Sequence, residues 1–227
     1  MIASQDRSFF IGASDTSTVV GNWTTATFKK WWQEKLGMSC TPKFNNKYTL
    51  AGTHYEHAIL GTIPFVEMDK QIIFPEIALR VNYDGMVGNA IYEVKTYKAE
   101  KEFKVSKNYW RQAQVEMFAA DSTELEIVAY PMTEDHYKNY FIPIDVNLIQ
   151  RFPIAYDQKF IEGEYLPKLI YLKHCMDVGI FPTKEDFKEW QATNQSELEQ
   201  QILQLRSNRG SLSVTVVGVS SVGIPTM

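Results

Sequence analysis

The sequence has few cysteines, no long hydrophobic run and no excess of positive charge, and each absence excludes a class of protein. Two cysteines in 227 residues are too few for a disulfide-stabilised scaffold, an all-cysteine zinc site or a four-cysteine iron–sulfur cluster. We therefore expect free thiols in a reducing compartment. No apolar segment approaches the roughly 20 residues that cross a bilayer, so we expect no membrane association. The net charge of −4 means that contact with nucleic acid would need a local basic patch.

Three catalytic motifs are also missing. Without a Gly-Lys pair there is no Walker A loop, and neither His-Glu-x-x-His nor G-x-S-x-G occurs. The first ten residues do not have the charged and apolar parts of a secretory signal. The composition, 44% hydrophobic and 22% charged, is typical of a globular protein. We therefore expect a soluble protein of the cytoplasm.

In the first half of the chain, the spacing of apolar residues changes clearly from one segment to the next. Apolar residues at helical spacing predict helices over about 25–36, 47–63 and 105–120. Alternation of apolar and polar residues predicts strands over 77–83 and 90–96, which Asp84-Gly85 would join as a hairpin. A third strand is expected over 125–130, ended by Pro131. These elements indicate a mixed α/β fold with a small central sheet flanked by helices.

The second half carries weaker signals. A strand over 140–146, broken by Pro143, and helical structure over 147–178, interrupted near Pro153, are expected. Thr183 with Asp186 resembles a capping arrangement that opens a helix from Lys184 to about Arg206. We therefore expect a single domain over 1–206 with a helical C-terminal part. The segment 207–227 has no charge after Arg209 and is either a flexible end or an edge strand recruited by a partner or neighbouring subunit.

The most informative segment runs from Asp84 to Lys95. Strand alternation places Glu93 and Lys95 on one side of a strand and turns Val94 to the other. The predicted hairpin brings Asp84 beside Glu93, and two converging carboxylates repel each other unless a cation lies between them. Hard oxygen ligands suit Mg²⁺ or Mn²⁺, and an adjacent ammonium group could orient water for attack on a phosphate. The alternative is a salt-bridging face of an exposed strand.

Neighbouring residues strengthen the nuclease interpretation. Glu56, at the rim of an apolar helix face, is a candidate third ligand or simply a solvated residue. Gln112 shares a helix face with Tyr109 and Glu116 and could bind a phosphate oxygen or position the lysine. Basic residues interleaved with aromatic ones follow the strand, and they are either a contact for the DNA backbone or a solvated face: Lys98, Lys101, Lys104, Lys107 and Arg111.

Five short elements in this order resemble the phage lambda exonuclease family, which includes the YqaJ-type viral recombinases, within the PD-(D/E)xK nuclease superfamily. The elements extend from Arg7 to Met117, and the chain beyond about Tyr130 matches nothing in that family. The one departure is Tyr83, which stands where the superfamily has a nominal proline. The elements are Ile11-Gly12-Ala13-Ser14-Asp15, Gly52-x-x-x-Glu56, Asp84-Gly85, Glu93-Val94-Lys95 and Tyr109-x-x-Gln112-x-Gln114-x-x-Met117.

The resemblance implies a restriction-endonuclease-like core and a set of site residues. Its acidic metal ligands would be Glu56, Asp84 and Glu93, with the carbonyl of Val94 as a further ligand. Lys95 would be the catalytic lysine, supported by Gln112, so that the catalytic set is Asp84, Glu93, Lys95 and Gln112. Arg7 and Ser14 match residues that hold the 5′-phosphate of a DNA end.

The resemblance also implies an activity. The protein would be a Mg²⁺-dependent 5′-to-3′ exonuclease, with Mn²⁺ able to substitute, that digests one strand of linear double-stranded DNA to mononucleotides. The 3′ overhang would pass to a single-strand annealing protein in phage-type recombination, and a homotrimeric ring would make digestion processive. The location would be the host cytoplasm if a phage encodes the chain. Two alternatives remain: a structure- or sequence-specific endonuclease of the same superfamily, and a DNA-end-binding module without turnover.

Overall fold

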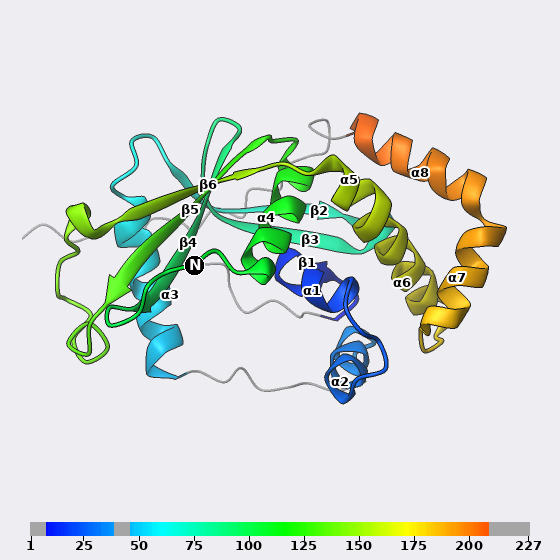
Figure 1. The fold of residues 1–227 in the computed structure, drawn as a ribbon, viewed down its shortest axis with the longest axis horizontal. Helices are drawn as coiled ribbons and strands as arrows, with labels where there is room; N and C mark the ends of the chain where they lie inside the picture. Colours follow the sequence, from blue (N-terminus) through cyan, green and yellow to red (C-terminus); the bar gives the residue numbers. More distant parts are fainter. Residues whose placement is uncertain (1–7, 39–45, 209–227) are drawn as a thin grey trace, which may run out of the picture.

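A six-stranded mixed sheet forms the centre of the computed structural model, which describes residues 8–38 and 46–208 (Figure 1). The strand order is β1-β3-β4-β5-β6, and β2 also pairs with β3. β1 and β3 are parallel, as are β4 and β5, whereas the other pairs are antiparallel. The strands are β1 (Ile11–Gly12), β2 (Glu67–Phe74), β3 (Leu79–Val87), β4 (Ala90–Lys98), β5 (Glu124–Met132) and β6 (Gln150–Ala155).

Helices flank this sheet, with α3 toward one end and α6 to α8 toward the other (Figure 1). Thr25, Asn46, Ser106 and Thr183 cap four of them by accepting hydrogen bonds from backbone N–H groups of the first turn. The helices are α1 (Thr16–Val19), α2 (Ala26–Lys35), α3 (Lys47–Leu60), α4 (Lys107–Ala120), α5 (Gln158–Phe160), α6 (Leu166–Val178), α7 (Lys184–Thr193) and α8 (Gln195–Asn208). Short 3₁₀ and π turns are η1 (Ala13–Asp15), η2 (Pro75–Ile77), η3 (Val146–Leu148) and η4 (Ile161–Tyr165).

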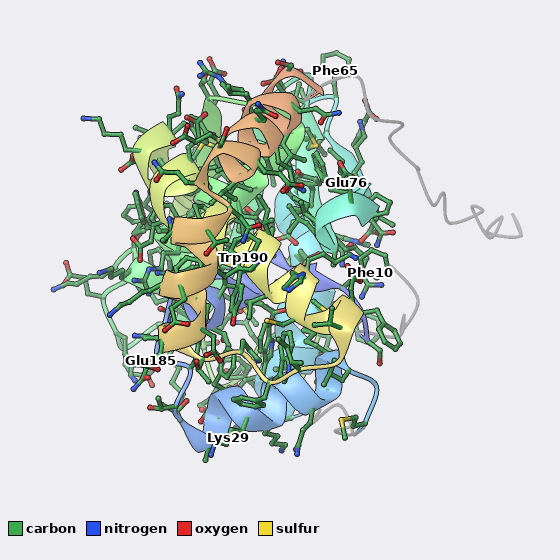
Figure 2. All side chains as sticks on the ribbon, turned by 90° about the vertical axis from the view of Figure 1, so that its right-hand side faces the viewer. Phe10, Lys29, Phe65, Glu76, Glu185 and Trp190 are labelled. Atoms are coloured by element: carbon green, nitrogen blue, oxygen red, sulfur yellow. The ribbon has the colours of Figure 1, made fainter. Side chains whose placement is uncertain are left out.

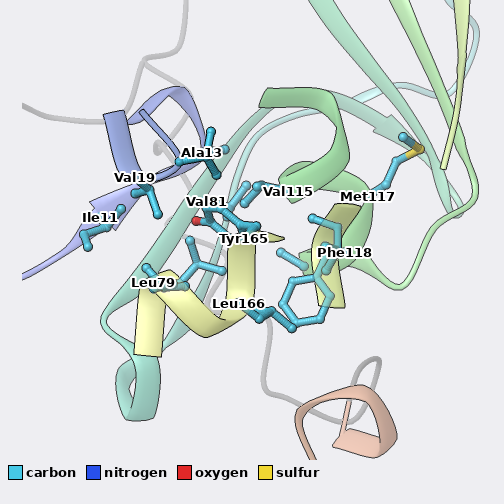
Figure 3. Packing of buried hydrophobic residues seen from close by; sticks show 14 of the residues in the cluster. Ile11, Ala13, Val19, Leu79, Val81, Val115, Met117, Phe118, Tyr165 and Leu166 are labelled. Carbon is cyan, nitrogen blue, oxygen red and sulfur yellow. The ribbon is translucent and has the colours of Figure 1, made fainter. Parts of the chain in front are cut away.

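The two faces of the sheet support different helices. Along β5, Ile127 and Ala129 pack into the main core with α4, whereas Val128 and Tyr130 pack into a second cluster with α3. Successive side chains of a strand point to opposite faces, so this division requires α3 and α4 to cover opposite sides. Figure 3 shows the main core, where residues of β3, α4, η4 and the first turns of the chain meet.

Aromatic rings attach the C-terminal helices to this core. Trp23 lies stacked on Tyr171 of α6 and edge-on to Phe187 of α7, and Tyr171 also contacts Trp190. Figure 2 shows Trp190 on the side of the molecule formed by the C-terminal helices. The predicted mixed α/β fold with a helical C-terminal part is confirmed. Among the described helices, none is long and apolar enough to cross a membrane.

The predicted position of the hairpin turn is wrong. Asp84 and Gly85 lie inside β3, and the chain turns between Val87 and Ala90 instead. Gly88 has a φ of +58° there, a conformation that glycine adopts without a steric cost. Because the strand continues past Asp84, its carboxylate lies in the interior of the sheet rather than at a loop.

Three predictions for the second half are also wrong. Residues 140–146 form no strand, and Pro143 there has no backbone N–H to donate to a neighbouring strand. The carbonyls of Asn139 and Ile142 accept hydrogen bonds from the Tyr55 hydroxyl instead. Part of the expected helix over 147–178 is the edge strand β6, where Pro153 is tolerated. The helix expected over 184–206 is interrupted at Asn194, whose side chain donates to the Trp190 carbonyl.

Strand β2 and the C-terminal tail also differ from what the sequence predicts or lie outside the described residues. The strand β2 (Glu67–Phe74) was not predicted, since its sequence does not alternate regularly between polar and apolar residues. From residue 209 onward the predicted tail over 207–227 lies outside the described residues, as does Cys40, whereas Cys175 is a buried free thiol.

Candidate active site

The predicted acidic residues meet where β3 and β4 diverge. The two strands pair only from Gly85–Val87 to Ala90–Tyr92, after which β3 continues beside β2 and β4 continues beside β5. Asp84 and Glu93 are the first residues beyond the paired stretch. Asp84 Oδ2 accepts a hydrogen bond from the backbone N–H of Val94 at 2.8 Å, which fixes the carboxylate inside the fork. The predicted proximity of Asp84 and Glu93 is therefore confirmed.

Helix α3 brings Glu56 to this fork. A Cβ on Gly85 would lie 2.7 Å from Leu60, and one on Gly52 would lie 3.2 Å from the Thr96 hydroxyl, so both glycines allow α3 to approach the sheet closely. A ligand atom of Glu56 lies within 4.8 Å of one of Asp69, and Glu56 lines one cavity together with Val94 and Lys95 of β4. The spacing Gly52-x-x-x-Glu56 thus has a physical reason. Gly52 is where α3 comes close to the sheet, and the Glu56 carboxylate lies one helical turn further along the same face.

Helix α4 completes the site from the opposite face. Gln112 Nε2 donates to Glu93 Oε1 at 2.6 Å and to Glu116 Oε1 at 2.7 Å. Lys95 Nζ forms an ion pair with the same Glu93 oxygen and lies 5.0 Å from the centre of the Tyr109 ring. The common helix face predicted for Tyr109, Gln112 and Glu116 is confirmed, and all three side chains belong to one network with Lys95.

Tyr83 lies buried beneath this network. Its hydroxyl donates to the backbone carbonyl of Glu116 at 3.0 Å. The side chain therefore ties α4 directly to β3, one residue before Asp84.

Burial and mutual repulsion shift the pKa values of the carboxyl groups at this fork. Burial, followed by the charges of Glu93 and Asp69, raises the pKa of Glu56 to about 7. Burial, followed by the charges of Glu93 and Glu56, raises the pKa of Asp84 well above its usual range. Burial alone would lower the pKa of Lys95, but the charges of Glu93 and Asp84 outweigh it and raise that pKa. Three carboxylates held this close favour a positive charge between them.

The donor set fits a hard divalent cation. Glu56, Asp84 and Glu93 offer carboxylate oxygens, and the carbonyl of Val94 follows directly on the same strand. Mg²⁺ and Mn²⁺ prefer such oxygen ligands and use few protein carboxylates. The described hydrogen bonds of Glu93, from Lys95 and Gln112, use Oε1, which leaves Oε2 as the oxygen available to a cation.

Two residues near the site are not among those predicted from the sequence. His57 Nε2 lies 3.1 Å from Asp69 Oδ2, and potential ligand atoms of Glu56, His57 and Asp69 all lie within 4.8 Å of one another. His57 directly follows Glu56, and the sequence excludes it from a zinc site because the His-Glu-x-x-His spacing is absent. Asp69 lies on the unpredicted strand β2, and only the pairing of β2 with β3 brings it here.

The two residues predicted to bind a 5′-phosphate have different outcomes. Ser14 is exposed on η1, which packs against α4. Asp15 holds this turn by accepting from the Gly12 N–H at 3.0 Å and pairing with Lys35 at 2.8 Å. Arg7 lies outside the described residues. The role of both residues therefore stays a prediction.

The predicted DNA-backbone residues lie in three places. Lys98 and Lys101 line a cavity of about 500 Å³ together with Glu56 and Lys95. Lys104 is exposed and pairs with Glu102 at 3.0 Å. A separate depression beside Trp110 contains the remaining two, Lys107 and Arg111. Only the first pair shares a cavity with the acidic cluster.

Comparison with known proteins gives structural neighbours but no sequence relatives. No protein-family model and no curated protein matches the chain. An alkaline exonuclease from Laribacter hongkongensis, LHK-Exo, is similar with a TM-score of 0.53 and 18% identity, over 91% of this chain and 96% of that chain. Its complex with dAMP gives a TM-score of 0.57 and 18% identity, over 84% and 95%.

A phage-related exonuclease from Haemophilus somnus 129PT is a further structural neighbour. Its TM-score is 0.51 at 16% identity, over 74% of this chain and 92% of that chain. These alignments extend over most of both partners, including the region beyond Tyr130 that resembled nothing in sequence. The chain therefore has the fold of the alkaline and phage-related exonucleases, as its sequence motifs led us to expect.

Proposed function

We propose that the protein is a metal-dependent exonuclease that digests one strand of linear double-stranded DNA from its 5′ end to mononucleotides. The observation that carries the proposal is the convergence of Glu56, Asp84, Glu93 and Lys95 in the fork between β3 and β4. That cluster coincides with the motifs of the lambda exonuclease family, and the fold is shared with solved exonucleases. Mg²⁺ is the proposed cofactor, and Mn²⁺ would substitute.

Each residue has a proposed role that follows from its contacts. Glu56, Asp84, Glu93 and the Val94 carbonyl would hold the cation, which when bound would stabilise negative charge on a phosphate oxygen. Lys95 would hold and orient the attacking water, since its ammonium group is fixed by Glu93. Gln112 would keep Glu93 and Lys95 in place. Ser14 and Arg7 would bind the terminal 5′-phosphate, which distinguishes a free end from an internal site.

Further features of the proposal follow from the resemblance. A single domain over 1–206 would act in the cytoplasm. Three copies would form a ring through which the duplex passes. The 3′ single-stranded overhang would pass to an annealing protein in phage-type recombination. Lys98 and Lys101, which line the cavity beside the acidic cluster, would contact the DNA backbone there.

The decisive experiment measures product release from linear duplex DNA with 5′-phosphate or 5′-hydroxyl ends, with Mg²⁺ or EDTA, beside a covalently closed circle. We expect mononucleotides from phosphorylated linear DNA only, and only with metal. Nicking of the circle would instead indicate an endonuclease that uses Asp84, Glu93 and Lys95. Binding to DNA ends without any metal-dependent product would indicate a binding module.

The end-binding pocket has its own test in Arg7→Ala. Removing one guanidinium that binds a phosphate should reduce the preference for 5′-phosphorylated over 5′-hydroxyl ends by about tenfold, within the range of one charge-assisted hydrogen bond. The rates on the two substrates are compared under single-turnover conditions. An equal loss on both substrates would make Arg7 a general contact rather than an end-specific one.

A further inference from the structure

Glu116 is a carboxyl group that the proposed chemistry does not use, although it is completely buried beside the site. Its relative exposure is 0%, and its Oε2 atom has no hydrogen-bond partner among the described residues. Leaving a buried polar atom unpaired costs about 1–3 kcal/mol. An apolar side chain of similar length would avoid this cost, so the carboxyl group calls for a functional explanation.

The contacts of Glu116 lead directly to Glu93. The amide nitrogen of Gln112 has two hydrogens, and it donates one to Glu93 Oε1 and the other to Glu116 Oε1. With both acceptors present, the amide has only one orientation that avoids placing its own oxygen against a carboxyl oxygen. Without Glu116, only the contact with Glu93 would hold the Gln112 side chain.

Glu116 is itself rigidly held. Its backbone carbonyl accepts from the Tyr83 hydroxyl at 3.0 Å, and Tyr83 precedes Asp84 on β3. Burial, followed by the charge of Glu93, raises the pKa of Glu116 well above its usual range. Glu116 Oε1 is held where the Gln112 amide donates to it at 2.7 Å.

We propose that Glu116 is a positioning residue that acts through Gln112 to orient Glu93, so that Oε1 faces Lys95 and Oε2 faces the metal. This inference rests on the proposed metal-dependent function. Glu116 touches neither metal nor substrate, and its contact with the ligand Glu93 passes through Gln112. Losing the partner that orients a metal ligand costs about 10- to 100-fold in metal affinity or activity, and without Glu116 that partner, Gln112, is no longer held in one orientation.

The test compares Glu116→Met with Glu116→Gln. Methionine fills the space but removes the acceptor, whereas glutamine keeps an acceptor oxygen. Direct Mn²⁺ binding is measured by calorimetry on the full chain, and the Mg²⁺ dependence of cleavage is measured alongside. We expect Glu116→Met to weaken Mn²⁺ binding at least tenfold, with unchanged or higher thermal stability, and Glu116→Gln to stay within threefold of the wild type.

Two controls separate positioning from general packing. Gln114→Met, on the same helix but away from the site, should lower stability without changing Mn²⁺ affinity. The double variant Gln112→Met/Glu116→Met should bind Mn²⁺ no more weakly than Gln112→Met alone, because the two residues act in series. If Glu116→Met does not fold, Glu116→Ala removes the same acceptor and takes its place.

The results that would overturn the proposal are specific. A folded Glu116→Met with Mn²⁺ affinity within twofold of the wild type, or additive losses in the double variant, would show that Glu116 does not act through Gln112. Failure of the proposed function is distinguishable, because the wild-type chain would then release no product from linear DNA with metal. The Mn²⁺ binding comparison does not depend on that activity.

Discussion

Helix α4 presents buried polar side chains on two sides, and they are satisfied very differently. Gln114, on one side, donates to the Ala155 carbonyl at 2.9 Å and accepts from the Asp157 N–H at 2.6 Å. On the other side, Gln112 lies between two carboxyl groups, and Glu116 leaves one oxygen without a partner. All described hydrogen-bonding atoms of Gln114 are thus paired, whereas the other side contains repulsion and an unpaired atom.

The difference separates a structural from a functional use of buried polarity. The Gln114 side satisfies β6 and the start of α5, where the backbone needs partners. The Gln112 side concentrates like charges that burial makes costly, an arrangement that a bound cation would relieve. Sites whose groups have strongly perturbed pKa values are candidates for catalysis for this reason. Changes on the two sides should therefore affect different measurements.

Lys95→Ala should give the largest effect. Removing the ammonium group that would orient the attacking water should lower single-turnover cleavage by about 10²- to 10⁴-fold, the range for a group acting on proton transfer. Circular dichroism and DNA binding should stay close to those of the wild type. A variant that still digests DNA at the wild-type rate would contradict the assignment of the site.

Gln114→Met should produce the opposite pattern. It removes the partner of the Ala155 carbonyl and of the Asp157 N–H, both in partly buried hydrogen bonds, so the free energy of unfolding should fall by about 1 kcal/mol. Urea denaturation measures this loss, and cleavage per folded molecule should be unchanged. A selective loss of cleavage with normal stability would show that the Gln114 side of α4 also serves the active site.

Glu56→Gln should expose the stability cost of the acidic site. Because the pKa of Glu56 is raised from 4.5 to about 7, the folded protein holds a proton that the unfolded chain has released between these values. Wild-type stability should therefore fall as the pH rises from 4.5 through 7, and glutamine removes this contribution. In EDTA, the variant should match the wild type near pH 5 and melt about 2–4 °C higher at pH 8, corresponding to about 1 kcal/mol.

The same comparison has a clear contrary outcome. If the melting temperatures of wild type and Glu56→Gln differ equally at both pH values, Glu56 does not titrate in this range. Adding Mg²⁺ at pH 8 should narrow the gap, since a cation bound by the wild-type carboxylates stabilises the folded state.

Lys104→Ala should have the smallest effect, because it lies on neither side of α4. Its side chain is 77% exposed and pairs with an equally exposed Glu102, so stability should change by less than about 0.5 kcal/mol. If Lys104 binds a DNA phosphate, the slope of log K against log salt should fall by about 0.9. Lys101→Ala, inside the cavity, provides the matched comparison. An unchanged slope for Lys104→Ala would show that Lys104 does not bind a DNA phosphate.

Much of the candidate site could be predicted from the sequence because its residues are close along the chain. Glu93 and Lys95 share a strand face by simple alternation, and Gln112 and Glu116 share a helix face by spacing. Four helix starts and three strands were also recognisable from caps and periodicity. These features depend on residues close together in the sequence, so they can be predicted without knowledge of the rest of the fold.

Other parts depended on contacts that no local pattern contains. Strand β6 was mistaken for helix because its partner, β5, lies about twenty residues earlier in the chain. Asp69 joins the acidic cluster only because β2 pairs with β3. The burial of Glu116 follows from packing of α4 on the sheet, since the same spacing on an exposed helix would leave it in water.

The sequence by itself determined the identity and order of the chemical groups: three carboxylates, a lysine and a glutamine, which lie on two helices and two strands. The tertiary structure alone decided that β3 and β4 diverge after three paired residues, which opens the fork that contains Asp84 and Glu93. It also decided which carboxyl groups lose contact with water. Strand divergence and desolvation depend on neighbours far away in the chain, and a one-dimensional pattern does not encode those distances.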